Sequence, residues 1–245
     1  MKISIICVYN NNEVLDSQLL SSLKKQNIDY EFIGIDNAKN KFNSAAAALN
    51  YGASQSSGDV LVFSHQDIIL KEECSLYEFA NAINQKEVGV IVGTQGVREK
   101  DKTYYSNLTA GAIYDPKLLT DFPKECLKVD CVDEGFFGMK KETWKQYMFD
   151  EVSCDNWHLY AVDQCLNARK NGYGVFVYPI QMHHFSFGRI TISYFNNLRT
   201  LCNKYRKSNR LIWTTCYKVY TNPLYINFLI LVWSMNRILR RKGLN

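Results

Sequence analysis

The sequence predicts an α/β domain with a mixed, mainly parallel sheet flanked by helices, followed by a C-terminal amphipathic helical tail. Three short apolar runs, at residues 3–8, 31–35 and 60–63, have the composition of strands buried on both faces. Helix-favouring segments at 15–23 and 45–53 separate these runs. The resulting β-α-β-α-β order implies parallel strands joined by right-handed crossovers, as in Rossmann-like folds.

The later part of the chain alternates less regularly. Its expected helices lie at 77–83, 142–147 and 157–170, and its expected strands lie at 88–92, 132–139 and 175–178. The helix at 157–170 should end before Asn171-Gly172, because glycine commonly follows the last residue of a helix. Residues 94–131 show little periodicity, so we interpret them as a variable stretch that faces the substrate.

Length and composition fit one globular domain. With 245 residues, of which 47% are hydrophobic and 22% charged, the chain can bury a full core and does not resemble a disordered protein. Its eight cysteines include no Cys-x-x-Cys pair, which argues against a zinc ribbon and favours buried, reduced thiols. The apolar start at residues 3–9 is too short for a signal peptide, so we expect a cytoplasmic protein.

The C-terminal segment is both apolar and basic. Residues 222–235 are largely apolar and are followed by Arg237, Arg240, Arg241 and Lys242. Since a bilayer span takes about 20 apolar residues, we expect a helix that lies on the anionic inner face of the cell membrane. Packing on the domain or in a homodimer is the alternative. Nucleic acid is disfavoured as a partner, because the basic residues do not interleave with a stacking platform.

Polar residues follow the third expected strand. The run at 60–63 leads into Ser64-His65-Gln66-Asp67, and ligands of open α/β sheets bind beyond the carboxyl ends of strands. Asp67 offers the hard carboxylate oxygen that Mg²⁺ or Mn²⁺ prefers. His65 is either a second ligand, which would favour Mn²⁺, or a hydrogen-bonding partner of a phosphate. A solvated loop without a function is the alternative.

The sequence lacks the glycine-based nucleotide-binding motifs. Its first turn reads Tyr9-Asn10-Asn11-Asn12, and no Gly-Lys-Ser/Thr loop occurs. A nucleotide on this sheet therefore needs a metal ion to carry its diphosphate. Asp36, at the end of the second strand, is positioned to accept a hydrogen bond from the imide N–H of uracil or thymine, with a turn cap as the alternative.

Taken together, these segments resemble family 2 glycosyltransferases of the GT-A fold, which are inverting enzymes with nucleotide-sugar donors. The resemblance rests on residues 3–10 with their Tyr9-Asn10 turn, on residues 31–36, and on the helix at 43–58 that contains Asn50 and Gly52. It covers roughly the first four-fifths of the chain. It implies a GT-A domain at 1–200, with a nucleotide-binding half at 1–93 and an acceptor-side half at 94–200, and then a helical tail at 201–245.

The resemblance also implies which residues bind the donor. The expected nucleotide-binding residues are Tyr9, Asn10, Asp36, Asn37, Asn43, His65 and Gln66. The family's metal motif is Asp-x-Asp, and this chain has His65-Gln66-Asp67 in its place, as one branch of the family does. The resemblance thus implies Asp67 as a ligand of Mn²⁺ or Mg²⁺, with His65 beside it. Relatives place a His-containing segment near the diphosphate, which implies His184 as a further ligand and His183 as its alternative.

An inverting transfer requires a carboxylate that takes the proton of the acceptor hydroxyl. Relatives carry a Glu-Asp pair near the start of a helix, where this chain has Tyr160-Ala161. The closest matching carboxylate is Asp163, so we predict Asp163 and Glu134 as catalytic residues, with Asp133 and Asp155 as alternatives. Trp157 and Tyr160 are candidates for stacking on a sugar, with core packing as the alternative.

The combined prediction is a metal-dependent, inverting glycosyltransferase. It moves a sugar from a nucleotide-sugar donor, with a UDP- or dTDP-sugar favoured, to a hydroxyl of a glycan or lipid-linked acceptor in cell-surface polysaccharide synthesis. The missing first Asp and the missing Glu-Asp pair suggest an alternative, a non-catalytic nucleotide- or glycan-binding module of the same fold. A nucleotidyltransferase is disfavoured, because its glycine- and lysine-rich opening loop is absent.

Overall fold

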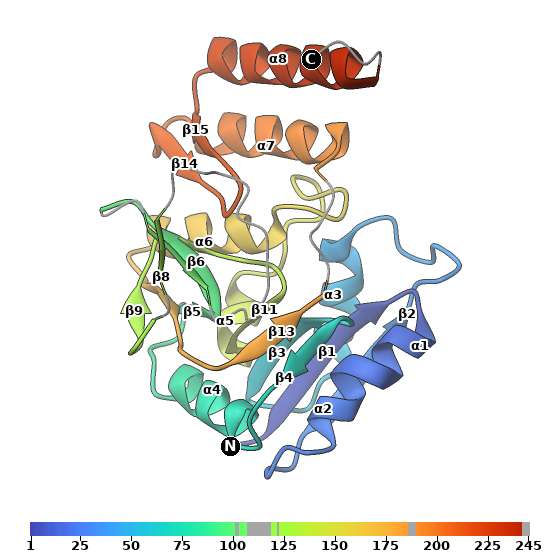
Figure 1. The fold of residues 1–245 in the computed structure, drawn as a ribbon. Coiled ribbons are helices and arrows are strands. Elements are labelled where there is room, and N and C mark those ends of the chain that lie inside the picture. The colour runs from blue at the N-terminus through green and yellow to red at the C-terminus, as the bar shows by residue number, and fades with distance from the viewer. Residues whose placement is uncertain (101–102, 107–118, 122, 186–189, 242–245) are drawn as a thin grey trace.

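A mixed seven-stranded sheet forms the centre of the molecule (Figure 1). The computed structural model describes residues 1–100, 103–106, 119–121, 123–185 and 190–241. In spatial order the strands of this sheet are β2 (Glu31–Asp36), β1 (Ile3–Tyr9), β3 (Val60–His65), β11 (Phe136–Lys140), β5 (Ile91–Gly93), β12 (Val175–Val177) and β9 (Leu127–Lys128). Helices cover both faces, so the predicted α/β fold class is confirmed.

The direction of the strands decides which residues meet at one edge of the sheet. β1 pairs with β2 and with β3 in parallel, so Asp36 lies opposite Tyr9, and His65 lies opposite Val8. β11 runs antiparallel to β3, with Phe136 opposite Ser64. The carboxyl ends of β1, β2 and β3 and the amino end of β11 therefore share an edge.

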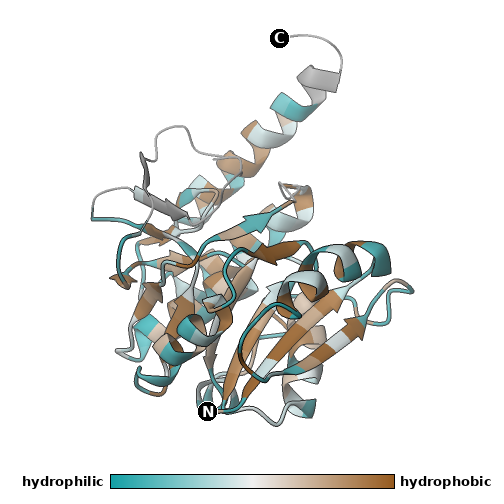
Figure 2. Ribbon diagram, turned by 60° about the horizontal axis from the view of Figure 1, so that its bottom comes forward, coloured by the Kyte–Doolittle hydropathy of each residue, from teal (hydrophilic) through white to brown (hydrophobic). Residues whose placement is uncertain are grey.

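The central strands are buried on both faces because their side chains alternate between two helical layers. Ile3, Ile5 and Cys7 of β1 face a core that also contains residues of α1 (Asn12–Leu15), α2 (Ser21–Leu23) and α4 (Ser75–Asn84). A single π-helical turn, Asp16–Leu20, joins α1 to α2. Ile6 points the other way, toward α3 (Ala45–Gln55), α5 (Lys141–Gln146) and α6 (Tyr160–Lys170). In Figure 2 the central strands are largely brown, and the helices beside them contain teal, hydrophilic segments.

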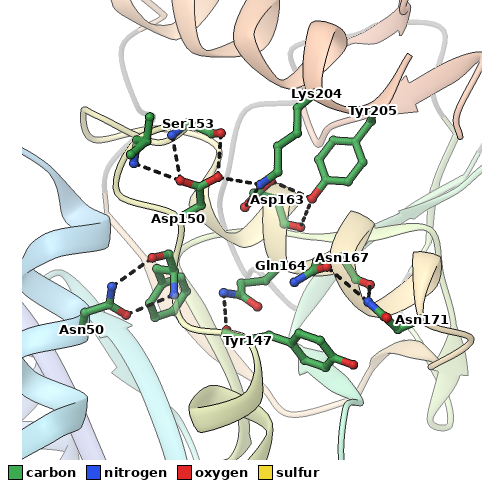
Figure 3. Close-up of polar contacts among 12 residues, drawn as sticks. Asn50, Tyr147, Asp150, Ser153, Asp163, Gln164, Asn167, Asn171, Lys204 and Tyr205 are labelled. Carbon is green, nitrogen blue, oxygen red and sulfur yellow. Dashed lines mark hydrogen bonds and ion pairs between the residues drawn. The ribbon is translucent and has the colours of Figure 1, made fainter. Parts of the chain in front are cut away.

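Helix α3 approaches the sheet closely at Gly52. A Cβ atom there would come within 2.6 Å of both Ile35 and Ile6, so only glycine allows this packing distance. Two residues earlier, the buried Asn50 side chain ties α3 to the loop after α5 (Figure 3). Its Oδ1 accepts hydrogen bonds from Trp144 Nε1 at 3.0 Å and Phe149 N at 3.1 Å, and its Nδ2 donates to Phe149 O at 2.9 Å.

Residues 94–131 contribute short strands to a second sheet. β6 (Gln95–Arg98), β7 (Thr103–Ser106) and β8 (Leu119–Asp121) form a second sheet with β10 (Cys131–Val132). These strands are at most four residues long, too short for an alternating pattern to stand out in the sequence. The sequence analysis therefore did not identify these strands, and residues 107–118 lie outside the described part of the chain.

Two predicted elements have different boundaries in the structure. The strand expected at 132–139 is two strands, β10 and β11, which belong to different sheets. They are separated by a turn in which the Asp133 carboxylate accepts a hydrogen bond from Gly135 N at 2.9 Å. The helix expected at 157–170 begins at Tyr160, because Leu159 adopts a left-handed backbone with φ of 66° and ends the preceding loop.

The C-terminal part stacks further elements on α6. Helix α7 (Ile192–Tyr205) is followed by a hairpin of β14 (Leu211–Trp213) and β15 (Lys218–Tyr220), and then by α8 (Pro223–Arg241). The predicted C-terminal helix is thus present, and Lys242 of the predicted basic cluster lies outside the described residues. No helix in the described ranges has the length and apolar character needed to cross a bilayer.

We predict that Asn50→Ala destabilises the protein by about 2–4 kcal/mol, because it leaves the buried Trp144 Nε1 and Phe149 N without an acceptor. Urea unfolding followed by tryptophan fluorescence measures this change. Gln55→Ala, at an exposed position of the same helix, is the matched control and should stay within about 0.5 kcal/mol of the parent. Equal effects of the two substitutions would contradict the structural role of Asn50.

Candidate active site

Three potential metal ligands meet at the shared edge of the sheet. His65 ends β3, and Asp67 follows two residues later. His184 reaches them because β4 (Ile68–Leu70) pairs antiparallel with β13 (Met182–His184), which sets His184 opposite Ile68. His184 Nε2 lies 3.4 Å from His65 Nδ1 and 3.4 Å from Asp67 Oδ1. The three ligand atoms lie within 4.8 Å of one another, as ligands of one ion do.

The pKa values of the two histidines in this cluster are shifted in opposite directions. Burial lowers the pKa of His65 below 6.5, and the positive charge of His184 lowers it further. Burial also lowers the pKa of His184, but the hydrogen bond and negative charge of Asp67 outweigh this and raise it. Burial raises the pKa of Asp67, whereas His184 and His65 lower it to a net value below normal. Asp67 is therefore ionised, as a metal ligand must be.

The donor set of the cluster fits a divalent transition metal. Two imidazoles and one carboxylate suit Mn²⁺ better than Mg²⁺, which prefers oxygen ligands. The second ring nitrogen of His65, Nε2, lies 3.2 Å from the hydroxyl of Tyr160, so this hydroxyl orients the ring. The predicted ligands His65, Asp67 and His184 thus come together, whereas the ring of His183 packs against Phe185 with centroids 4.0 Å apart.

Gln66, the middle residue of the His65-Gln66-Asp67 segment, forms hydrogen bonds with the turn after β1. Gln66 Oε1 accepts hydrogen bonds from the backbone N–H groups of Asn10 and Asn11, at 3.0 and 3.1 Å. Gln66 Nε2 donates to Asn10 Oδ1 at 2.9 Å. Gln66 therefore holds the turn after β1 beside the end of β3.

A pocket of about 560 Å³ opens beside this cluster. It runs along the carboxyl ends of β1 and β3 toward the start of α6. Seven of the residues predicted for donor binding, metal binding or catalysis line it: Tyr9, Asn10, Asn37, His65, Gln66, Asp67 and Glu134. Its volume falls in the range of small-molecule and cofactor sites.

Glu134 is a half-buried carboxylate that lines this pocket. Its Oε1 atom is inaccessible to solvent and has no hydrogen-bond partner among the described residues. Burial raises the pKa of Glu134 well above 4.5, the charge of Asp133 adds to the rise, and the backbone N–H groups at 159–161 oppose it. A carboxyl group with a raised pKa in a pocket is a typical proton acceptor or donor in catalysis.

Asp163, the other predicted catalytic residue, points toward Lys204 and Tyr205 (Figure 3). It is not among the pocket-lining residues and is only 3% exposed. Lys204 Nζ lies 2.7 Å from one of its oxygens and 2.9 Å from the other, and Tyr205 Oη donates to the carboxylate at 2.8 Å. Lys204 also bonds to Asp150 at 2.8 Å, so these side chains join α6 to α7.

Other predicted residues have local roles or lie at the rim. The Asp36 carboxylate accepts a hydrogen bond from Ala38 N at 2.8 Å, which is the turn-capping alternative, although Ala38 itself lines the pocket. Asn37 exchanges hydrogen bonds with the backbone of Phe42. Asn43 is not among the lining residues.

Trp157 and Tyr160, the two aromatic candidates for sugar stacking, differ in their exposure. Trp157 is 41% exposed and lines the pocket, so its ring is available to a ligand. The ring of Tyr160 is buried against Phe137 and Phe149, and only its hydroxyl takes part in the site through His65. Asn40, with φ of 52°, also lines the pocket and was missed, because no sequence pattern marks it.

The remaining alternatives for the catalytic carboxylate lie outside the lining set. The Asp133 carboxylate accepts hydrogen bonds from Gly135 N at 2.9 Å and from Thr215 Oγ1 at 3.0 Å. Asp155 is exposed on the loop before α6.

Comparison with known proteins assigns the fold and the family. The crystal structure of GalNAc-T7 with UDP, GalNAc and Mn²⁺ matches with a TM-score of 0.58 at 11% sequence identity, over 82% of this chain and 47% of that chain. This chain thus spans about half the length of GalNAc-T7. A197 from STIV matches with a TM-score of 0.44 at 15% identity, over 76% of this chain and 86% of that one.

Comparison with curated protein sequences finds no match. The likeness to GalNAc-T7 establishes the GT-A fold. A family model described as glycosyltransferase like family matches residues 4–209, which is most of the chain. The protein therefore belongs to this glycosyltransferase-like family.

Proposed function

We propose that the protein is a metal-dependent, inverting glycosyltransferase that uses a nucleotide-sugar donor. The observation that carries the proposal is the convergence of His65, Asp67 and His184 beside a pocket of about 560 Å³. A divalent ion held by these residues would neutralise the charge of the donor's diphosphate leaving group. The fold and the family membership support sugar transfer as the reaction.

We place the nucleoside of the donor at the end of the pocket formed by Tyr9, Asn37 and Asn40. Asp36 lies beside this end, next to the lining residue Ala38. The diphosphate would then lie near Asp67, at the carboxyl edge of the parallel strands. Because the GalNAc-T7 crystal contains UDP and Mn²⁺, we favour a UDP-sugar over a dTDP-sugar and Mn²⁺ over Mg²⁺.

We assign the general base to Glu134 and a structural role to Asp163. Glu134 lines the pocket and has an oxygen without a partner, whereas both oxygens of Asp163 bond to Lys204. In an inverting transfer, Glu134 takes the proton of the acceptor hydroxyl while that oxygen attacks the anomeric carbon from the side opposite the leaving group. Trp157, exposed at the rim, offers an apolar surface to the sugar or the acceptor.

The proposal also includes the acceptor and the side from which it approaches. The donor would occupy the half at 1–93 and the acceptor would approach from the half at 94–200. An acceptor hydroxyl on a glycan or a lipid-linked glycan, in cytoplasmic assembly of a cell-surface polysaccharide, suits an enzyme of this family.

Replacing a metal ligand should abolish metal-dependent donor binding. We expect Asp67→Asn and His184→Ala each to weaken the binding of UDP in the presence of Mn²⁺ roughly 100-fold or more, measured by calorimetry. His183→Ala is the matched control, because it removes a neighbouring imidazole that packs on Phe185 and should bind like the parent. Tight binding by Asp67→Asn would place the ion elsewhere.

Glu134→Gln should lower the turnover of metal-dependent UDP-sugar hydrolysis about 10²–10⁴-fold, with UDP affinity kept. In the parent, turnover should rise with pH as Glu134 loses its proton, since burial raises its pKa.

Asp163→Asn should instead lower stability and spare turnover in the folded fraction. The reverse result would move the base to Asp163. Binding of UDP with Mn²⁺, without turnover of any nucleotide sugar or acceptor, would indicate a binding module.

The raised pKa of Glu134 also predicts how stability depends on pH. The folded protein holds this proton more tightly than the unfolded chain, whose glutamate pKa stays near 4.5. The stabilisation is full below pH 4.5 and is lost as the pH rises through the folded pKa. With divalent ions chelated, Glu134→Gln should therefore melt at increasingly higher temperature than the parent as the pH rises. A difference that does not change with pH would contradict burial of an ionisable Glu134.

A further inference from the structure

Helix α8 is apolar on two opposite faces. Its inner face packs on the domain: Ile226 is buried, and the ring of Trp233 lies 4.8 Å from that of Phe195 on α7. A surface helix that packs on one side normally presents polar residues on the other. The outer face of α8 does not follow this rule.

The outer face carries a row of large apolar side chains. Leu224, Phe228, Leu231 and Met235 recur at spacings of four, three and four residues, so they lie along one side of the helix. Their exposed fractions are 80%, 63%, 56% and 53%. Figure 2 shows α8 projecting from the rest of the molecule with brown, apolar segments along its length. An exposed apolar row of this size marks a surface that binds something.

A basic pocket adjoins the amino end of this row. It has a volume of about 840 Å³ and lies between the end of α7, the β14–β15 hairpin and the start of α8. Arg206, Lys207 and Arg210 line it, and the described lining residues include no acidic side chain. Tyr220 and Tyr225, whose rings lie 5.3 Å apart, line the same pocket and are partly exposed.

Positive charge is concentrated in the C-terminal part of the sequence, which contains α8 and the basic pocket. No Asp or Glu follows Asp163, while 13 of the 29 Lys and Arg residues do. With all 24 acidic residues at or before Asp163, the remaining 16 basic residues leave residues 1–163 with a net charge of −8, against +13 for residues 164–245. In Figure 1, α8 lies at the end of the molecule opposite the amino terminus.

From these observations we infer that α8 and the adjoining basic pocket form one docking surface for a bilayer of anionic phospholipids. The apolar row enters the boundary between headgroups and acyl chains, and Arg206, Lys207 and Arg210 bind phosphate groups of the lipid headgroups. Tyrosines such as Tyr220 and Tyr225 are typical of this boundary, where one end of the ring is apolar and the other is wet.

A bilayer fits this surface better than a second copy of the chain. In a two-fold dimer this surface meets a copy of itself, so two positively charged surfaces would face each other. Anionic headgroups neutralise these charges instead. The helix lies on the membrane and does not span it, since no helix in the described part of the chain meets the requirements for crossing.

Flotation with phospholipid vesicles tests this inference without any assay of sugar transfer. The full chain should float with vesicles that contain phosphatidylglycerol and much less with vesicles of phosphatidylcholine alone, and added salt should release it. Arg206→Gln/Lys207→Gln/Arg210→Gln should lower the partition coefficient about 100-fold, since each basic residue contributes about fivefold near an anionic surface. Phe228→Ser/Leu231→Ser should also lose binding, with an unchanged melting temperature because both side chains are exposed.

Lys24→Gln/Lys25→Gln/Lys71→Gln is the matched control, because it removes three exposed charges at the other end of the molecule and should float like the parent. Equal losses in this control, or equal binding to both kinds of vesicle, would overturn the inference. So would a parent that is dimeric without lipid and becomes monomeric in Phe228→Ser/Leu231→Ser, which would assign the surface to a second copy. If inorganic phosphate released the protein from the vesicles and chloride of equal ionic strength did not, the pocket would be a site for free phosphate and not for lipid headgroups.

Discussion

The position of strand β3 between two partners of opposite direction is the constraint on which the candidate site depends. Its parallel pairing with β1 aligns the ends of both strands, and its antiparallel pairing with β11 brings the start of β11 to the same edge. The loop that carries Glu134 therefore reaches His65, although the two residues are far apart in the sequence. Burial of β3 on both faces fixes this register, because a shift by one residue would turn its side chains to the wrong layers.

The contacts of two carboxylates, the buried Asp163 and the half-buried Glu134, suggest different roles for them. Asp163 has a cation and a phenol beside it, so its charge serves to join α6 to α7. Glu134 has an oxygen that no described group satisfies, and a buried polar atom without a partner costs stability. Such a cost is expected where a side chain is kept for a substrate. Sequence similarity to relatives favoured Asp163, whereas the contacts favour Glu134.

Much of the fold was predictable because its signals are local. The strands at 3–8, 31–35 and 60–63 and the helix at 45–53 have the lengths and periodicities of buried elements, and the structure contains all of them. Asp67 could be named as a candidate metal ligand from its place after a buried strand. The three-residue strands β4 and β13 were not predictable, because their pairing joins segments more than a hundred residues apart without a local pattern. The Lys204 partner of Asp163 was hidden for the same reason.

The side chain of Gln66 explains what the middle position of the His65-Gln66-Asp67 segment contributes. Among the described residues, the Gln66 side chain forms three hydrogen bonds, all with Asn10 and Asn11, so these bonds hold the turn after β1 in place. A binding loop that is ordered beforehand loses little conformational entropy when a ligand arrives. For the proposed donor, the conformational entropy of this turn is therefore lost during folding and not on binding.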